Sequence, residues 1–155
     1  MKRLSCIFIL LFFIGCADDN TLDKENTFKA ALVWSKTYGG SLEENTNSVV
    51  ATSDGGMLIL GHTASNDGDI VKSHSLTDIL LTKLDAEGNL IWTKTIGGSL
   101  NDFGMSIIAT NDGNYAIAGY SASNDGDVPG NVGQHDFFIS KITEQGNIIW
   151  SKNYG

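Results

Sequence analysis

Two short acidic loops are the sharpest candidates for chemistry in this sequence. Both read Ser-Asn-Asp-Gly-Asp, with carboxylates at Asp67 and Asp69 in the first loop and at Asp125 and Asp127 in the second. Ca²⁺ takes about six to eight oxygen ligands, and alternate carboxylates on a glycine-containing loop supply several of them. The loops lack the length and the closing glutamate of an EF-hand. Calcium, the one cofactor suggested here, is therefore one interpretation, and Asx turns facing solvent are the other.

An aspartate and a lysine also recur at equivalent positions of two segments. Asp78 and Asp136 are followed five residues later by Lys83 and Lys141. A catalytic site is normally unique in a chain, so recurrence favours a structural role, in which each aspartate ties neighbouring strands through backbone N–H groups. The three histidines have no zinc-site spacing, and the serine-hydrolase, P-loop and dinucleotide motifs are absent. We therefore predict no catalytic residue, and the sequence leans against an enzyme.

Composition narrows the classes of protein further. The chain has 155 residues, 18 of them glycine and one proline, and 18% are charged. This length suits one ordinary domain. A formal net charge of -8 argues against nucleic acid as a partner, because phosphate binding depends on clustered lysine and arginine.

The chain repeats itself with a fixed period. Trp34, Trp92 and Trp150 are spaced by 58 residues, and the units 34–91 and 92–149 align without a gap. The two units are identical at 25 of 58 positions, and a third unit begins at residue 150. A repeat of this length is one supersecondary unit that buries its apolar faces against its neighbours.

Each unit is predicted to form four antiparallel strands. β-branched and aliphatic runs are separated by turn signals such as Asp54-Gly55 and Gly88-Asn89, and no helical period is present after residue 14. An isolated strand over 31–37 precedes the two units. The predicted strands are 48–52, 56–63, 78–85 and 90–95 in the first unit, and 106–110, 114–121, 136–143 and 148–154 in the second.

Four short strands with one tryptophan at a fixed place resemble a β-propeller blade, and the repeats are similar to those of Bacteroidetes surface proteins. The resemblance implies an all-β fold of antiparallel blades over 29–155, with Trp34, Trp92 and Trp150 packed between blades or, alternatively, exposed for sugar stacking. Propellers close with about four to eight blades, and this chain holds two. Three interpretations stay open: a fragment of a longer protein, a two-blade protomer that completes a ring by self-association, and an open two-sheet sandwich.

The N-terminus resembles a bacterial lipoprotein signal. Lys2 and Arg3 precede an apolar run over 4–14, which is too short to span a bilayer, and Phe13-Ile14-Gly15-Cys16 is similar to a lipobox, although Phe13 stands where leucine is usual. The resemblance implies cleavage between Gly15 and Cys16 and acylation of Cys16. Residues 1–15 are then the signal and 16–28 a polar tether. An ordinary secretory signal and an uncleaved anchor are the alternatives.

These resemblances imply a protein anchored by lipid in the bacterial outer membrane, and the acidic residues after Cys16 resemble the tract of surface-exported lipoproteins. We expect a non-enzymatic binding or scaffold module with a protein or glycan ligand. The alternative is a fragment of a polysaccharide-acting enzyme or a glycan-binding accessory protein. Glycoside hydrolysis needs two converging carboxylates, and the sequence nominates no pair.

Overall fold

The computed structural model describes residues 31–71, 74 and 76–155. Within them the chain is all-β and contains no helix, as predicted. Cys16 and the predicted signal and tether lie outside the described residues. The strands are β1 (Glu44–Ala51), β2 (Met57–Thr63), β3 (Asp78–Leu84), β4 (Leu90–Ile96), β5 (Asp102–Ala109), β6 (Tyr115–Ser121), β7 (Asp136–Ile142) and β8 (Ile148–Tyr154).

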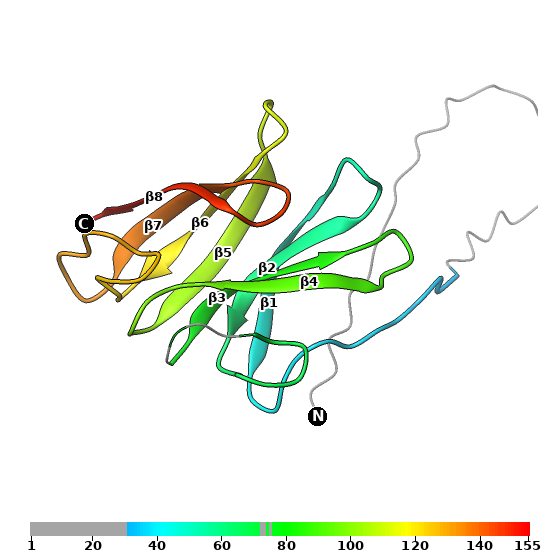
Figure 1. Ribbon diagram of the computed structural model, residues 1–155, viewed down its shortest axis with the longest axis horizontal. Helices are drawn as coiled ribbons and strands as arrows, with labels where there is room; N and C mark the ends of the chain where they lie inside the picture. Colours follow the sequence, from blue (N-terminus) through cyan, green and yellow to red (C-terminus); the bar gives the residue numbers. More distant parts are fainter. Residues whose placement is uncertain (1–30, 72–73, 75) are drawn as a thin grey trace, which may run out of the picture. The chain divides into compact units, whose positions relative to one another are not determined.

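The eight strands form two antiparallel sheets, one per repeat. The strand orders are β1-β2-β3-β4 and β5-β6-β7-β8, so each sheet is a simple meander (Figure 1). Both sheets lie in the compact unit Tyr38–Gly155. Tight turns follow the predicted Gly signals: Gly55 has a φ of 84°, and its N–H donates to the carbonyl of Thr52. The prediction of four antiparallel strands per repeat is confirmed.

Two predicted boundaries were wrong. The first strand of each repeat begins at Glu44 or Asp102, four residues before the predicted start. A β-bulge between Thr46 and Ser48 lets the polar residues before it continue to pair with β2. Residues 31–37 contain no strand. A strand needs a paired neighbour, and neither sheet includes this segment, so the isolated strand predicted over 31–37 was also wrong.

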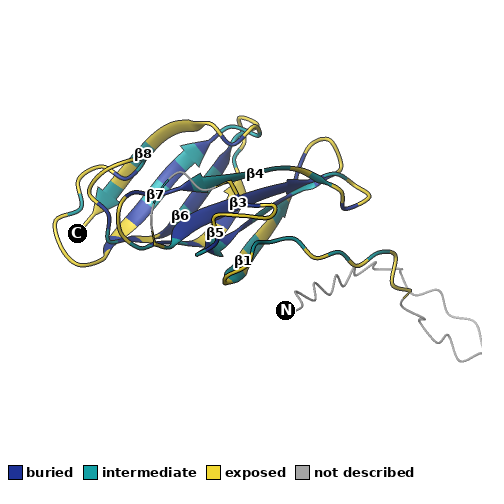
Figure 2. Cartoon of the chain, turned by 60° about the horizontal axis from the view of Figure 1, so that its bottom comes forward, coloured by how far each residue is buried: buried dark blue, intermediate teal, exposed yellow. Residues whose placement is uncertain are grey.

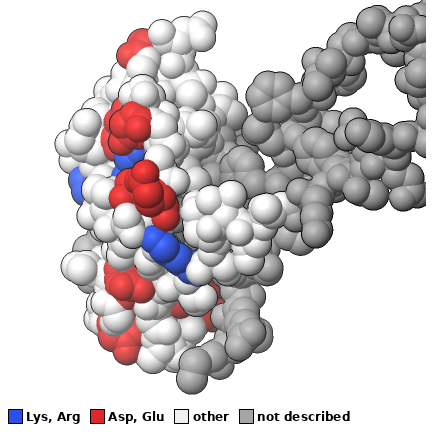
Figure 3. All heavy atoms as spheres, turned by 90° about the vertical axis from the view of Figure 1, so that its right-hand side faces the viewer, with Lys and Arg blue, Asp and Glu red and all other residues white. Residues whose placement is uncertain are grey.

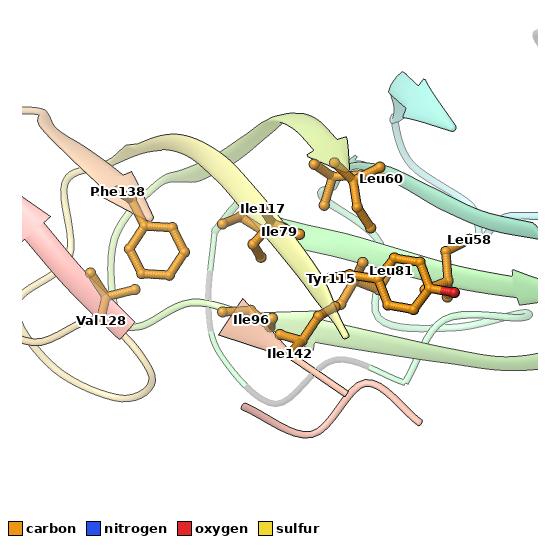
Figure 4. Packing of buried hydrophobic residues seen from close by; sticks show 11 residues of the cluster. Leu58, Leu60, Ile79, Leu81, Ile96, Tyr115, Ile117, Val128, Phe138 and Ile142 are labelled. Atoms are coloured by element: carbon orange, nitrogen blue, oxygen red, sulfur yellow. The ribbon is translucent and has the colours of Figure 1, made fainter. Parts of the chain in front are cut away.

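An apolar core lies between the two sheets (Figure 4). Strand β5 lies against β1, β2 and β3. The sheets approach each other closely at Gly104, where an added Cβ atom would lie 2.8 Å from the carbonyl oxygen of Gly61 and 2.9 Å from side-chain carbons of Leu60 and Ile79. Glycine therefore lets β5 approach the first sheet. The core residues are Leu58, Leu60, Ile79, Leu81 and Ile96 from the first repeat, and Ile107, Tyr115, Ile117, Val128, Phe138 and Ile142 from the second.

Polar contacts also join the sheets. Asn47 donates through Nδ2 to the carbonyl of Gly104 at 2.6 Å, and Lys94 Nζ lies 3.0 Å from Asn147 Oδ1. Lys83 has a side chain that is 5% exposed, and its Nζ lies 2.7 Å from Asp54 and 3.7 Å from Glu144 of the second repeat. Acidic and basic side chains lie side by side on the face of the molecule shown in Figure 3. Buried cations require such partners, so the second sheet helps to accommodate Lys83.

The Lys83–Asp54 contact predicts how stability depends on pH. Hydrogen bonds from Lys83 and Thr52 hold the pKa of Asp54 well below its ordinary value of 3.8. A group whose pKa is depressed by folding stabilises the fold above its unfolded pKa, and that contribution is lost as pH falls toward the folded value. We therefore expect the Tm to fall below about pH 4 and Asp54→Asn to flatten this part of the curve.

Thermal unfolding monitored by circular dichroism across the acid range measures the effect. Lys152→Gln removes an exposed charge that does not titrate in the acid range, and it is the control that should keep the wild-type slope. An Asp54→Asn curve parallel to that of the wild type would show that this pairing does not contribute to acid sensitivity.

Candidate functional site

In the two predicted calcium loops, the aspartate carboxylates accept hydrogen bonds from backbone N–H groups. Asp67 Oδ1 accepts a hydrogen bond from the N–H of Ser41 at 2.7 Å, and Asp125 Oδ1 accepts one from Ser99 at the same distance. Asp69 and Asp127 accept N–H groups of Gly39 and Gly97 at 3.1 and 3.5 Å. The loops therefore bind the Gly-Gly-Ser segment that precedes β1 or β5. The hydrogen bond from Ser41 lowers the pKa of Asp67.

These contacts lead to a prediction about metal removal. Among the residues that the structure describes, no three His, Cys, Asp or Glu side chains converge on one point. Because backbone N–H groups satisfy carboxylate oxygens of Asp67 and Asp125, we expect EDTA to leave the Tm unchanged after pre-equilibration with calcium. Differential scanning fluorimetry measures this. A lower Tm on chelation would assign a structural metal to the loops.

The predicted strand-start aspartates are buried at the beginnings of β3 and β7. Asp136 Oδ2 accepts a hydrogen bond from the N–H of Val132 at 2.7 Å, and His74 Nδ1 lies 3.9 Å from Asp78 Oδ2. A third acidic position was missed from sequence. Asp102, at the start of β5, accepts hydrogen bonds from Ser123 Oγ and the N–H of Gly98, both at 2.8 Å. Asp102 and Asp136 therefore bind groups of local loops, which is a structural arrangement, and Asp78 lies beside the loop residue His74.

The tryptophans expected to pack between repeats lie in different environments. Trp92 in β4 packs against the inter-sheet core, and the turn at Gly146 approaches its ring. Its counterpart Trp150 in β8 is 39% exposed. Trp34 lies in the irregular segment 31–37. The second sheet covers the first tryptophan of the pair, whereas no described element covers Trp150 in the same way.

A row of aromatic side chains crosses the exposed face of the second sheet. Phe103, Tyr120, Phe137 and Tyr154 are consecutive register partners on β5, β6, β7 and β8. Directly opposed residues on paired strands place their side chains on the same face. The rings of Phe103 and Tyr120 are stacked with centroids 4.8 Å apart. We call this surface, with Ile108 and Trp150, the aromatic face.

Histidines flank the row. His62 of the first repeat packs edge-on against Phe103, with centroids 4.9 Å apart, and His135 lies 5.7 Å from Tyr120. Burial lowers the pKa of His62, so its ring favours the neutral form that packs on an aromatic edge. The row therefore begins at the contact between the two repeats and runs outward to the edge strand β8.

Exposure distinguishes the aromatic face from its counterpart in the first repeat. Phe137 and Tyr154 are 51% and 56% exposed, whereas Ile79 and Ile96 at the equivalent positions are 1% and 2% exposed. In Figure 2, β8 is largely yellow and teal while β3 is dark blue. The second sheet covers this face in the first repeat. The aromatic face is thus an apolar sheet surface that lacks such a cover among the described residues.

The centre of the aromatic face has small side chains. Ala116 and Ala118 in β6 replace the core residues Leu58 and Leu60 of β2. Ala116 pairs with Ile108, which is exposed, on one side and with Lys141 on the other. The face therefore combines exposed rings, an aliphatic side chain and a cation around two alanines. Contiguous exposed apolar surface of this kind is typical of a binding site.

Comparison with known proteins gives a limited likeness. No protein-family model matches the chain. Over 94 residues the chain is 29% identical to the regulatory protein FlaEY of Caulobacter vibrioides. The match covers 56% of this chain and 10% of that protein, so the chain spans a small part of its length. In the part of the chain that the structure describes, no helix is long and apolar enough to cross a membrane.

Proposed function

We propose that this chain is a lipid-anchored bacterial surface protein whose two sheets are propeller-like blades that act as a non-enzymatic binding or scaffold module. The aromatic face is its binding surface. The observation that carries the proposal is the exposure of Phe137 and Tyr154 at positions where the first repeat buries isoleucine. Binding of a partner that covers water-exposed rings is stabilised by about 25 cal/mol for each Å² of apolar surface removed from water.

The lipid anchor is supported by the lipobox-like Phe13-Ile14-Gly15-Cys16 and the basic, apolar segment before it. Anchoring by two or more acyl chains is stable, whereas one chain binds reversibly. The test is metabolic labelling with palmitate in a Gram-negative host. We expect label on the wild-type chain and none on Cys16→Ser, whereas labelled Cys16→Ser protein would exclude acylation at this residue.

A second candidate function is glycan binding. Phe103 and Tyr120 form a stacked pair, and exposed aromatic rings are suitable platforms for the apolar faces of sugar rings. The full chain, solubilised in detergent, can be incubated with immobilised polysaccharides. Retention that is lost in Phe137→Lys would support a glycan-binding face, and the release of new reducing ends would indicate an enzyme. Failure of Phe137→Lys to change any binding would contradict the aromatic face as the binding surface.

A further inference from the structure

The contact between the two repeats provides a template for what covers the aromatic face. In the first repeat, the face that carries Leu60 and Ile79 is covered by the second sheet. The covering surface of the second sheet includes Ile107, Tyr115 and Ile117. The contact therefore joins two different faces of the repeat: a receiving face, here that of the first sheet, and a covering face, here that of the second. Within any one repeat, these two faces lie on opposite sides of the sheet.

Each chain presents both halves of this contact. The aromatic face is the counterpart of the face that carries Leu60 and Ile79. The opposite face of the first sheet is the counterpart of the covering surface: Val49, Met57 and Ile59 stand where the second repeat has Ile107, Tyr115 and Ile117. We call it the Val49 face. Val49 is 44% exposed, whereas Ile107 is 4% exposed. Among the described residues, an exposed receiving face and a partly exposed covering face therefore occur in the same chain.

Side-chain sizes at the position of Gly104 are complementary in part between these two faces. Within the chain, Gly104 faces the large side chains of Leu60 and Ile79. If the Val49 face packed on the aromatic face in the same way, Thr46 would replace Gly104, Ala118 would replace Leu60 and Phe137 would replace Ile79. The smaller Ala118 leaves room for Thr46, whereas the larger Phe137 requires the two sheets to lie slightly farther apart at this point than they do within the chain.

Two of the polar contacts between the repeats would also recur. The N–H of Ile107 donates to Ser48 Oγ at 3.2 Å, and the counterparts are Val49 and Ser106. The Lys94–Asn147 contact has Lys152 and Asn89 as counterparts. The Lys83–Glu144 contact would not recur, because Ala86 stands at the position of Glu144.

We propose that the aromatic face binds the Val49 face of a second copy of this chain. The proposal rests on the aromatic face as the binding surface of the proposed function and names its partner. The contact is heterologous: one face of each chain meets a different face of the next, so repeated contacts form a ring or an open array. Lipid anchoring at a membrane would raise the effective concentration of neighbouring chains and favour the contact.

The test uses the full chain in detergent and measures its mass by analytical ultracentrifugation over a range of concentrations. We expect the wild type to self-associate, and both Phe137→Lys and Val49→Lys to be monomeric. Because each variant retains the face that the other lacks, an equimolar mixture should form a dimer and nothing larger. Val132→Lys, at a loop side chain that is 82% exposed, is the control and should associate like the wild type. Circular dichroism confirms that each variant is folded.

Other outcomes overturn the proposal. A monomeric wild type excludes the second copy as the partner. Loss of association in Phe137→Lys together with retention in Val49→Lys would indicate contact between two aromatic faces. A monomeric wild type that retains a glycan through Phe137 would leave the proposed function standing without self-association. If Phe137→Lys changed neither self-association nor glycan binding, the proposed function would be excluded as well.

Discussion

Ile79→Ala is expected to lower the free energy of unfolding by about 2–5 kcal/mol, because it removes a buried aliphatic side chain and leaves a cavity. Ile79 is 1% exposed and lies in the core between the two sheets. The matched control is Phe137→Ala at the equivalent position of the second repeat. Phenylalanine has the larger side chain, so equal burial would make this second substitution at least as costly.

We expect the opposite order, with Phe137→Ala costing less than Ile79→Ala, because Phe137 is half-exposed. Urea denaturation of the full chain in detergent, at a concentration where it is monomeric, measures both values. Equal losses, or a larger loss for Phe137→Ala, would mean that the second sheet does not cover the first in the manner described.

Gly61→Ala is expected to destabilise the fold by about 3 kcal/mol or more, since a Cβ atom at this position would overlap rigid backbone. An added Cβ would lie 1.7 Å from the carbonyl oxygen of Asn45 in β1. The β-bulge at Thr46 brings the two strands into this close approach. Gly119, at the equivalent position of the second repeat, meets the carbonyl oxygen of Phe103 at 1.9 Å.

Gly113→Ala is the control for this substitution. Gly113 has a φ of 78°, and an added Cβ atom would have nothing within 4 Å. The replacement is therefore destabilising only because alanine must adopt a left-handed conformation, which costs about 1–2 kcal/mol. Chemical denaturation of the three proteins gives the comparison. A Gly61→Ala chain as stable as Gly113→Ala would contradict the close strand approach at the bulge.

Much of the fold could be predicted from sequence because local signals coincide with the repeat. Asp54-Gly55 marks a turn in one unit and Asp112-Gly113 marks it in the other, so the four-strand meander appears twice. The start of β5 was harder to predict. The residues Asp102–Gly104 lie before a bulge, which interrupts the alternation of apolar and polar residues that identifies a strand.

The aromatic row was missed for the same reason. Phe103 lies outside the strand predicted at 106–110, so its pairing with Tyr120 could not be recognised. The difference in exposure between the two repeats could not be predicted from the sequence either, because equivalent positions in the two repeats carry similar apolar residues. Whether Ile79 or Phe137 is covered depends on the neighbouring sheet, which is a property of packing between repeats. The signal that could have revealed the row is the presence of one aromatic residue on each of four neighbouring strands, at positions that the strand pairing places opposite one another.

Hydroxyl-radical footprinting of the full chain in detergent tests the central claim most directly, because it reports the solvent exposure of individual aromatic side chains. At low protein concentration, Phe137 and Tyr154 should be modified readily while Phe138 of the inter-sheet core is protected. At high concentration, Phe137 and Tyr154 should become protected, as expected for an aromatic face covered by a second chain. Modification of both residues at every concentration would contradict self-association, and protection of both at every concentration would contradict an exposed aromatic face.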